Sequence, residues 1–472
     1  MITWTTLSLL AHWLIAIGMV IYVPQRRPPA AARSWLLLIL LLPWLGLLLY
    51  LLIGRATLPG HRREQQERVS KLIRATVAAR TVTNPEVALV PPAWQPMAGL
   101  AQALGDFAVR GGNHCDLLSD YQEAIARLVA DIDAASDHVH LLYYIFAADR
   151  TGTLVAEALV RATGRGVRCR VLMDGTGSKR GFRALSPRLR NAGIEVVAML
   201  PFSLFRRRAA RFDLRNHRKI AVIDGRIGYT GSQNLVDADF IPGLVYRELV
   251  VRVTGPAVHQ LQGVFICDWY FETDHLLDHR PLMPEPTAAG TTTAIVLPSG
   301  PGYPHANNMQ LLVGLIHAAN HRVVITTPYF IPPESLLDAL LTAALRGVAV
   351  QLIVSRQIDQ VLVGLAQRSF YDQLLEGGIA VAAHHGTFLH AKHVSIDDDV
   401  ALIGSSNMDI RSFALNAEIS LVTFDRAVVA NLRRNEADYL TKAEPLDLAT
   451  WRQRPALLRI VQNLARLTDS VL

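Results

Sequence analysis

The chain contains very little lysine and very little cysteine. Its 472 residues include 5 lysines against 42 arginines, and 3 cysteines. Cys115, Cys169 and Cys267 are scattered, odd in number and without the spacing of metal ligands. They argue against a disulfide scaffold and against a zinc site, and they fit a reducing compartment. The net charge of +7 favours anionic partners, so nucleic acid, acidic lipid and phosphorylated metabolites all stay open on charge alone.

Two of the five lysines occupy the same place in two copies of one short pattern. The pattern is a histidine, a lysine two residues later and an aspartate five residues after that, and the copies start 173 residues apart. The six residues are His217, Lys219, Asp224, His390, Lys392 and Asp397. A compact ammonium with three donors suits a crowded phosphate site in which a planar guanidinium would not fit. The pattern therefore indicates a site for a phosphate ester.

Two long apolar runs lie at the N-terminus. Residues 2–23 carry no formal charge, and residues 35–53 form a second run that is rich in leucine. Each is close to the ~20 residues that cross a bilayer as a helix, and the joining segment PQRRPPAAARS is short and Pro-rich. We expect a transmembrane hairpin over residues 1–58 rather than a signal peptide, because no basic stretch precedes the first run. More arginine and lysine follows the second run than lies in the loop, which places the body in the cytoplasm.

Beyond the hairpin the chain divides into a linker and two related halves. HVHLLYYIF, VRCRVLMD and NAGIEVVAML in the first half correspond to HRVVITTPYF, VAVQLIVS and EGGIAVAAHH in the second, with helical stretches between them. Apolar β-rich runs alternating with amphipathic helices predict α/β units with buried strands. We expect a linker over 59–95, one domain over 96–283 and a second over 284–472. The second domain ends in an amphipathic helix, which either lies on a membrane or, as we expect, packs its apolar stripe into the core.

Each copy of the pattern is followed by similar polar residues at matching distances. GSQN and GSSN place an asparagine 17 residues after each histidine, and a glutamate follows in YRELVV and in LNAEISLV. The residues are Ser232, Asn234 and Glu248 in the first half and Ser405, Asn407 and Glu418 in the second. We expect the serines and asparagines, in tight turns that open helices, to bind a substrate phosphate rather than act as ordinary N-caps. We expect each glutamate to fix the tautomer of an imidazole rather than to be solvated at a strand end.

These residues resemble the paired H-x-K-x4-D motifs of the phospholipase D superfamily. The resemblance covers essentially the whole chain and narrows to the bacterial cardiolipin synthases, through YYIFAADRTG, TPYFIPPESLLDAL, LAQRSFYDQLLEGGI and SSNMDIRSFALNAE. It implies two homologous α/β domains with mixed sheets flanked by helices, related by a pseudo-twofold axis. One active site would lie where the motifs meet. It also implies a multi-pass protein of the bacterial inner membrane.

The residue types themselves indicate the chemistry. A histidine that attacks as neutral imidazole forms a phosphohistidine, while a second, protonated histidine delivers a proton to the leaving alkoxide. The lysines and asparagines would stabilise the charge on the phosphoryl oxygens, so we expect no metal and no cofactor. Following the family, we assign His217 as nucleophile and His390 as acid/base, with the reverse left open. We expect Asp224 and Asp397 to be structural partners of nearby cations.

The resemblance implies transfer of a phosphatidyl group between two phosphatidylglycerol molecules, giving cardiolipin and glycerol. Hydrolysis to phosphatidic acid and transfer from phosphatidylethanolamine stay open, and a nuclease or a non-catalytic membrane scaffold fits less well. The expected partners are phosphatidylglycerol, other anionic phospholipids and the bilayer, with no nucleic acid; the oligomeric state is open. The arginine-rich loop at 201–215 suits either anionic headgroups or plain solvent.

Overall fold

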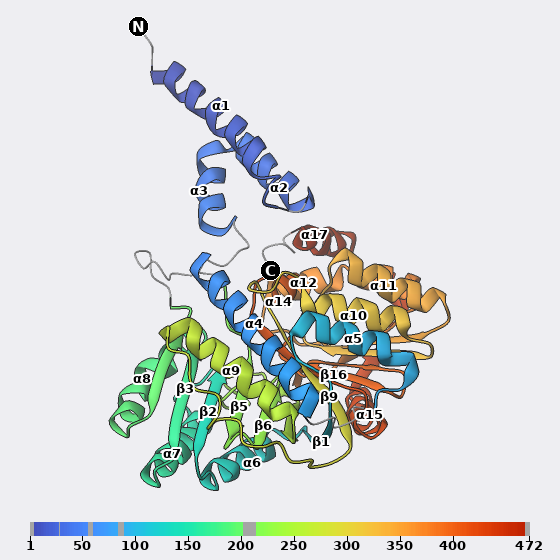
Figure 1. The fold of residues 1–472 in the computed structure, drawn as a ribbon. Helices are drawn as coiled ribbons and strands as arrows, with labels where there is room; N and C mark the ends of the chain where they lie inside the picture. Colours follow the sequence, from blue (N-terminus) through green and yellow to red (C-terminus); the bar gives the residue numbers. More distant parts are fainter. Residues whose placement is uncertain (1–3, 28, 55–59, 84–88, 202–213, 468–472) are drawn as a thin grey trace.

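The N-terminal segment forms three helices that stand apart from the body (Figure 1). The computed structural model describes residues 4–27, 29–54, 60–83, 89–201 and 214–467. The helices are α1 (Trp4–Tyr22), α2 (Pro29–Leu41) and α3 (Pro43–Ile53). The prediction of one continuous helix over 35–53 is wrong, because Pro43 begins a new helix and Leu42 before it has a non-helical φ of −136°. No helix within the described ranges is both long and apolar enough to cross a membrane.

The segment expected as a linker contains a long helix. Helix α4 (Gly60–Thr83) lies along α9 (Ala257–Thr273), as Figure 1 shows. Arg62 of α4 donates to both carboxylate oxygens of Glu272 at 2.9 and 3.0 Å, and Gln65 donates to Asp274 at 2.7 Å. Because the Arg62–Glu272 pair is buried and bidentate, α4 is fastened to the first half.

A single 15-stranded mixed sheet runs through both halves. One half contributes β1 (Arg110–Leu118), β8 (Val250–Thr254), β6 (Ile227–Gly231), β5 (Lys219–Ile223), β2 (His138–Tyr143), β3 (Arg168–Asp174) and β4 (Glu195–Met199), in that order. The other half contributes β9 (Thr292–Ser299), β18 (Glu418–Thr423), β16 (Val400–Gly404), β15 (His393–Ile396), β10 (Arg322–Thr327), β12 (Ala349–Ser355), β13 (Ala380–His384) and β19 (Ala443–Pro445). The halves join where β1 pairs with β9. Outward from this junction, corresponding strands of the two halves follow one another in the same order.

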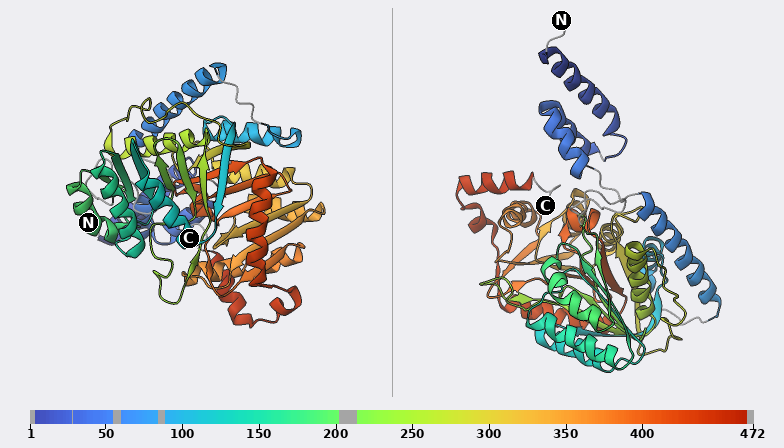
Figure 2. Two further views of the ribbon diagram at one scale, coloured as in Figure 1. Left: turned by 90° about the horizontal axis from the view of Figure 1, so that it is seen from below. Right: turned by 90° about the vertical axis from the view of Figure 1, so that its left-hand side faces the viewer.

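This strand order confirms the α/β fold with mixed sheets flanked by helices. In each half the strand that carries the motif is antiparallel to the next strand outward, and the two strands beyond that one are parallel to it. The edge strand β19 is antiparallel to β13. The repeated strands of the sequence analysis are β2, β3 and β4 and their counterparts β10, β12 and β13, and the motif strands are β5 and β15. Such buried, mostly apolar strands require cover on both faces, which the helices provide (Figures 1 and 2).

The flanking helices follow the strands in the chain. The remaining helices are η1 (Pro92–Trp94), α5 (Gln95–Gly105), α6 (Tyr121–Asp133), α7 (Arg150–Gly164), α8 (Lys179–Asn191), α10 (Asn307–Ala318), α11 (Glu334–Leu345), α12 (Val361–Arg368), α13 (Tyr371–Glu376), α14 (Ile410–Ala414), α15 (Arg426–Thr441), α16 (Leu448–Arg452) and α17 (Ala456–Arg466). Helix α5 was expected in the first domain, but Asn307 of α10 donates to Leu104 O of α5 at 2.7 Å. The helix therefore packs on the second half, beside α10 in Figure 1.

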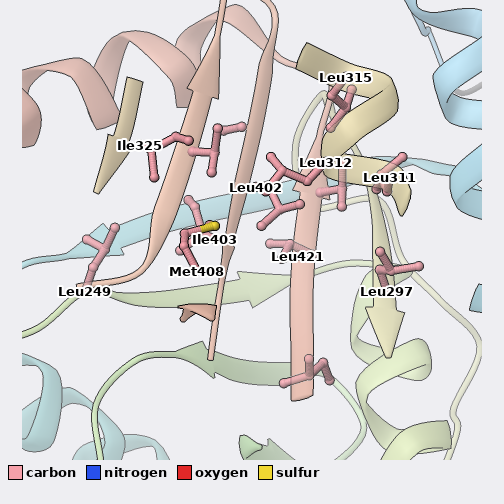
Figure 3. Packing of buried hydrophobic residues seen from close by; sticks show 14 of the residues in the cluster. Leu249, Leu297, Leu311, Leu312, Leu315, Ile325, Leu402, Ile403, Met408 and Leu421 are labelled. Atoms are coloured by element: carbon pink, nitrogen blue, oxygen red, sulfur yellow. The ribbon is translucent and has the colours of Figure 1, made fainter. Parts of the chain in front are cut away.

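Apolar side chains of α10 and of the strands on both sides of the second motif strand form one buried core. Figure 3 shows apolar side chains of α10 meeting those of the sheet. The labelled residues are Leu249, Leu297, Leu311, Leu312, Leu315, Ile325, Leu402, Ile403, Met408 and Leu421, all of them buried. A close-packed layer of this kind holds the polar residues that follow β16 in one position.

Candidate active site

Each motif histidine lies beside a short β-bridge between the backbones of the two halves. Asn216 bridges Ala417, and His217 N donates to Ala417 O at 2.8 Å. On the other side, β14 (Phe388–Leu389) pairs with β7 (Tyr246–Arg247), and His390 N donates to Arg247 O at 2.8 Å. Each histidine is thus attached to the residue that precedes a glutamate of the opposite half.

The two imidazoles are held by glutamates in a crosswise arrangement. His217 Nδ1 lies 3.0 Å from both carboxylate oxygens of Glu418, and His390 Nδ1 lies 2.6 Å from Glu248 Oε1. A carboxylate only accepts hydrogen bonds, so Nδ1 of each histidine carries the proton and Nε2 keeps its lone pair. The sequence indicated a glutamate for each imidazole, but nothing in it showed that the glutamate comes from the other half.

A buried ion pair fixes one of these bridges. Arg218 donates to both carboxylate oxygens of Asp268 on α9 at 2.7 and 2.6 Å. The same guanidinium donates to Glu418 O at 3.0 Å and to Ser299 O at 3.2 Å, both in the second half. Arg218 follows His217 in the chain and binds the backbone carbonyl of Glu418. It therefore keeps Glu418 next to His217.

The two lysines lie buried beside the histidines in the same way. Lys219 Nζ donates to His217 O and Lys392 Nζ donates to His390 O, each at 2.7 Å. Burial lowers the pKa of Lys219 to about 7 and that of Lys392 to about 8, although Glu418 and Glu248 oppose the shift. Each ammonium has three donors and uses one on this carbonyl. Both lysines lie in one electrostatic neighbourhood, because Lys392 contributes to the lowering of the pKa of Lys219.

The imidazoles titrate below their ordinary range. Burial lowers the pKa of His217 to about 4, with the Glu418 carboxylate opposing and the lysine ammonium groups adding to the shift. Burial also lowers the pKa of His390, although the Glu248 carboxylate acts to raise it. Burial alone would raise the pKa of both glutamates, but their histidine and lysine neighbours outweigh it and hold them below the usual value. Neutral imidazoles therefore face buried carboxylate anions near pH 7.

The serines after the motifs are engaged within the protein. Ser405 Oγ donates to Glu418 Oε2 at 2.5 Å and accepts from Ile419 N at 3.0 Å. Ser232 Oγ accepts from Leu249 N at 2.9 Å. These contacts hold the Glu418 side chain and the backbone of the adjoining strands in place, and the phosphate-binding role expected for the hydroxyls stays a prediction.

The asparagines lie buried at the same turns. Asn234 Oδ1 accepts from Ile145 N at 3.1 Å, whereas Asn407 Oδ1 is buried without a hydrogen-bond partner in the described part of the chain. Helix α14 follows the second turn after the N-cap Asp409, and residues 235–245 after the first turn are not helical. The expectation of a helix after both turns is thus confirmed only for the second.

The motif aspartates bind backbone amides, not cations. Asp224 accepts from the N–H groups of Ser136, Asp137 and His138 at 2.8–2.9 Å, and Asp397 accepts from residues 320–322 at 2.8–3.3 Å. Both aspartates have a left-handed backbone, with φ of 53° and 49°. Burial opposes ionisation of Asp224, but these N–H groups outweigh it and hold its pKa below the usual value. The expectation of cation partners is wrong. Three consecutive backbone N–H groups at the start of the neighbouring strand need an acceptor in each half, and the aspartate carboxylate accepts from them instead of from a cation.

Aromatic side chains that the sequence analysis did not single out surround the imidazoles. Tyr144 meets His217 edge-on at 4.9 Å between ring centres, and Tyr246 meets His390 at 5.2 Å. Tyr246 and Tyr329 both donate to Asp359, at 3.2 and 2.5 Å. A signal was present, because Tyr144 directly follows β2 and Tyr329 lies two residues after β10, and these strands pair with the two motif strands.

Comparisons with known proteins identify the family of the chain. A family described as "Cardiolipin synthase, PLD-like domain" matches residues 128–269 and 312–438, and one described as "Phospholipase_D-nuclease N-terminal" matches residues 13–55. Cardiolipin synthase A of Pectobacterium carotovorum subsp. carotovorum (strain PC1) is 36% identical over 98% of this chain and 97% of its own length. Cardiolipin synthase A of Yersinia pseudotuberculosis serotype O:3 (strain YPIII) is 35% identical, with the same shares covered.

A solved structure supports the fold. Phosphatidylserine synthase of Haemophilus influenzae Rd KW20 superposes with a TM-score of 0.58 at 16% identity, covering 76% of this chain and 95% of that one. Identity this low shows a shared fold alone. The family matches include both motif histidines and both lysines, and the relatives align over nearly the full length. The chain belongs to the cardiolipin synthase family, with two phospholipase D-like domains.

Proposed function

We propose that this protein is a phosphatidyltransferase that makes cardiolipin from two phosphatidylglycerol molecules with release of glycerol. The observation that carries the proposal is the pair of imidazoles whose Nδ1 atoms are bound by glutamates of the opposite half, each beside a buried lysine. Two histidines of matched surroundings suit a double displacement, in which the same phosphorus is attacked twice.

In the first step His217 Nε2 attacks the phosphorus of one phosphatidylglycerol. The bond between phosphorus and the glycerol oxygen breaks, and protonated His390 gives its proton to that oxygen, so glycerol leaves. The bound phosphodiester brings a negative charge that, with Glu248, raises the pKa of His390 and favours its protonated form. The low pKa of His217 supports its assignment as nucleophile, because a neutral imidazole is available over a wide pH range.

In the second step the hydroxyl group of another phosphatidylglycerol attacks the phosphohistidine. His390 accepts the hydroxyl proton, the phosphorus–nitrogen bond to His217 breaks, and cardiolipin is released. Lys219, Lys392 and the amide groups of Asn234 and Asn407 bind the phosphoryl oxygens, on which charge develops.

The N-terminal helices supply the membrane contact of this proposal. Their exposed side chains include those of Trp4, Trp13, Leu14, Leu41 and Trp44. A surface so rich in leucine and tryptophan suits the apolar interior and the interface of a bilayer. We therefore propose that residues 1–54 insert into the bacterial inner membrane, with the body in the cytoplasm. The arginine-rich loop, residues 202–213 in particular, lies outside the described residues, so headgroup binding there stays a prediction.

Lipid products decide between this function and its alternatives. Purified protein in vesicles of labelled phosphatidylglycerol should give cardiolipin and an equal amount of glycerol. Phosphatidic acid as the main product would show a hydrolase instead, and cardiolipin that forms only with added phosphatidylethanolamine would change the donor. DNA cleavage without lipid turnover would refute the lipid function. His217→Ala and His390→Ala should each abolish turnover, while His385→Ala, an exposed histidine nearby, should retain it.

A further inference from the structure

The last helix presents its apolar side chains outward. On α17 the residues Leu457, Ile460 and Leu464 are 73%, 54% and 58% exposed, and Leu467 just after the helix is 76% exposed, whereas Gln462 and Ala465 are buried. The expectation that its apolar stripe packs into the core is therefore wrong. A helix that turns leucine and isoleucine away from the protein requires an apolar partner outside it.

The outward orientation is fixed by contacts on the inner side of the helix. Arg454 donates to Gln462 Oε1 at 2.9 Å and to Asp372 Oδ1 at 3.2 Å. The Arg466 guanidinium lies 4.1 Å from the centre of the buried Phe370 ring. These polar and cation–π contacts seat the helix by its hydrophilic side, so the exposed stripe is a built feature of the surface.

The exposed stripe continues toward the active site. Helix α17 packs along α12, whose first residues, Val361 and Leu362, are also exposed. Two residues before α12 lies Asp359, which binds the hydroxyl groups of Tyr246 and Tyr329 next to His390. The ring of Tyr246 also contacts the ring of Phe240, with 4.7 Å between the ring centres. Phe240 and Val245 are exposed. We call these exposed residues of α17, α12 and residues 240–245 the apolar rim.

We propose that the apolar rim is a second membrane-docking surface, which seats the mouth of the active site on an anionic phospholipid bilayer. The site takes the headgroup side of the lipid, and α17 lies in the plane of the interface with its stripe among the acyl chains. Helices α17 and α12 lie on the same side of the body as α1–α3 in two perpendicular views, so both surfaces can meet one membrane (Figures 1 and 2). The exposed Arg459 at the side of the stripe suits anionic headgroups.

A fluorescent probe tests docking without any chemistry. The full chain carrying Ile460→Cys, labelled with an environment-sensitive dye, is compared with Leu154→Cys, an exposed leucine on α7 at the far end of the body. The three native cysteines are buried. In vesicles of phosphatidylglycerol and phosphatidylcholine, the dye at 460 should shift to the blue and be quenched by lipids with a quencher on the acyl chain, and the dye at 154 should not. A dye at 460 that stays in water, or that shifts only with protein concentration because a second copy covers it, overturns the proposal.

Activity on two forms of the substrate gives an independent test, which rests on the proposed function. The variant Leu457→Asp/Ile460→Asp/Leu464→Asp should lose about tenfold or more in turnover of bilayer phosphatidylglycerol. It should keep its turnover of a short-chain phosphatidylglycerol that is dissolved as monomers, and Leu154→Asp should keep both. Equal losses on both substrates, or no loss on vesicles, overturn the proposal. If the unchanged protein makes no cardiolipin from either substrate, the proposed function fails, while the probe at 460 still decides on docking.

Discussion

The crosswise glutamates lead to the sharpest prediction for this enzyme. In Glu418→Gln the amide still accepts a hydrogen bond from His217 Nδ1, but the bond loses its charge. Hydrogen bonds to charged groups contribute ~1.5–3 kcal/mol. The neutral hydrogen bond keeps ~0.5–1.5 kcal/mol of this, so the loss is ~1–1.5 kcal/mol. If that loss is fully felt when His217 attacks, the attack slows by about 5–13-fold. The variant also removes the main opposing charge that supports the pKa of Lys219, so less of that lysine is protonated near pH 7.

A substrate with a good leaving group separates the two glutamates. A phosphatidyl ester of nitrophenol needs no proton on its leaving oxygen, so its burst of nitrophenol reports the attack of the nucleophile alone. Glu418→Gln should slow this burst, and Glu248→Gln should leave it nearly unchanged. With phosphatidylglycerol both variants should be slow, because glycerol leaves only when His390 delivers a proton. Digestion of the trapped intermediate identifies the histidine that carries the phosphatidyl group.

The control is another buried glutamate. Glu436 on α15 accepts from Ser395 Oγ at 2.8 Å, and burial raises its pKa to about 7. At about pH 6 this carboxyl group is mostly neutral, so Glu436→Gln changes little charge and should keep the burst measured at that pH. The crosswise reasoning fails if the burst depends on the glutamate from the same half as the labelled histidine. It fails equally if neither glutamate variant changes the burst.

Three further predictions concern charged residues. The value of kcat/KM should fall as pH rises through the pKa values of about 7 for Lys219 and about 8 for Lys392, since the phosphate then loses its ammonium partners; an alkaline profile without this fall would contradict it. Arg218→Met should destabilise the protein by ~3–5 kcal/mol, because it leaves Asp268 buried and unpaired, and Arg218→Met/Asp268→Leu should regain part of the lost melting temperature. Asp224→Asn should lower the melting temperature with little change in kcat, and the stability that Asp224 supplies should be present above its ordinary pKa of ~3.9 and be lost as pH falls through its lowered folded-state pKa. A variant of Asp224 that folds normally but does not turn over would contradict its structural role.

Local patterns in the sequence predicted the parts of the fold that depend on neighbouring residues. The strands β2, β3 and β4 and their counterparts were visible as short apolar runs, because buried strands need β-branched residues throughout. The break at Pro43 was also a local signal, and reading residues 35–53 only by their hydropathy missed it. The exposed face of α17 could not be read in this way, since an amphipathic pattern shows that a helix has two faces but not which of them meets the protein.

The active site shows most clearly where prediction from the sequence ends. Each glutamate follows the motif of its own half at a similar distance, so chain order suggests that Glu248 serves His217 and Glu418 serves His390. The opposite pairing arises from two short backbone exchanges, Asn216 with Ala417 and β14 with β7, which bring together residues about 140–200 positions apart. Neither half therefore contains a histidine together with the carboxylate that orients it. Under the proposed mechanism, activity depends on docking of the two halves, and the buried Arg218 that crosses their junction couples the stability of the protein to the position of His217.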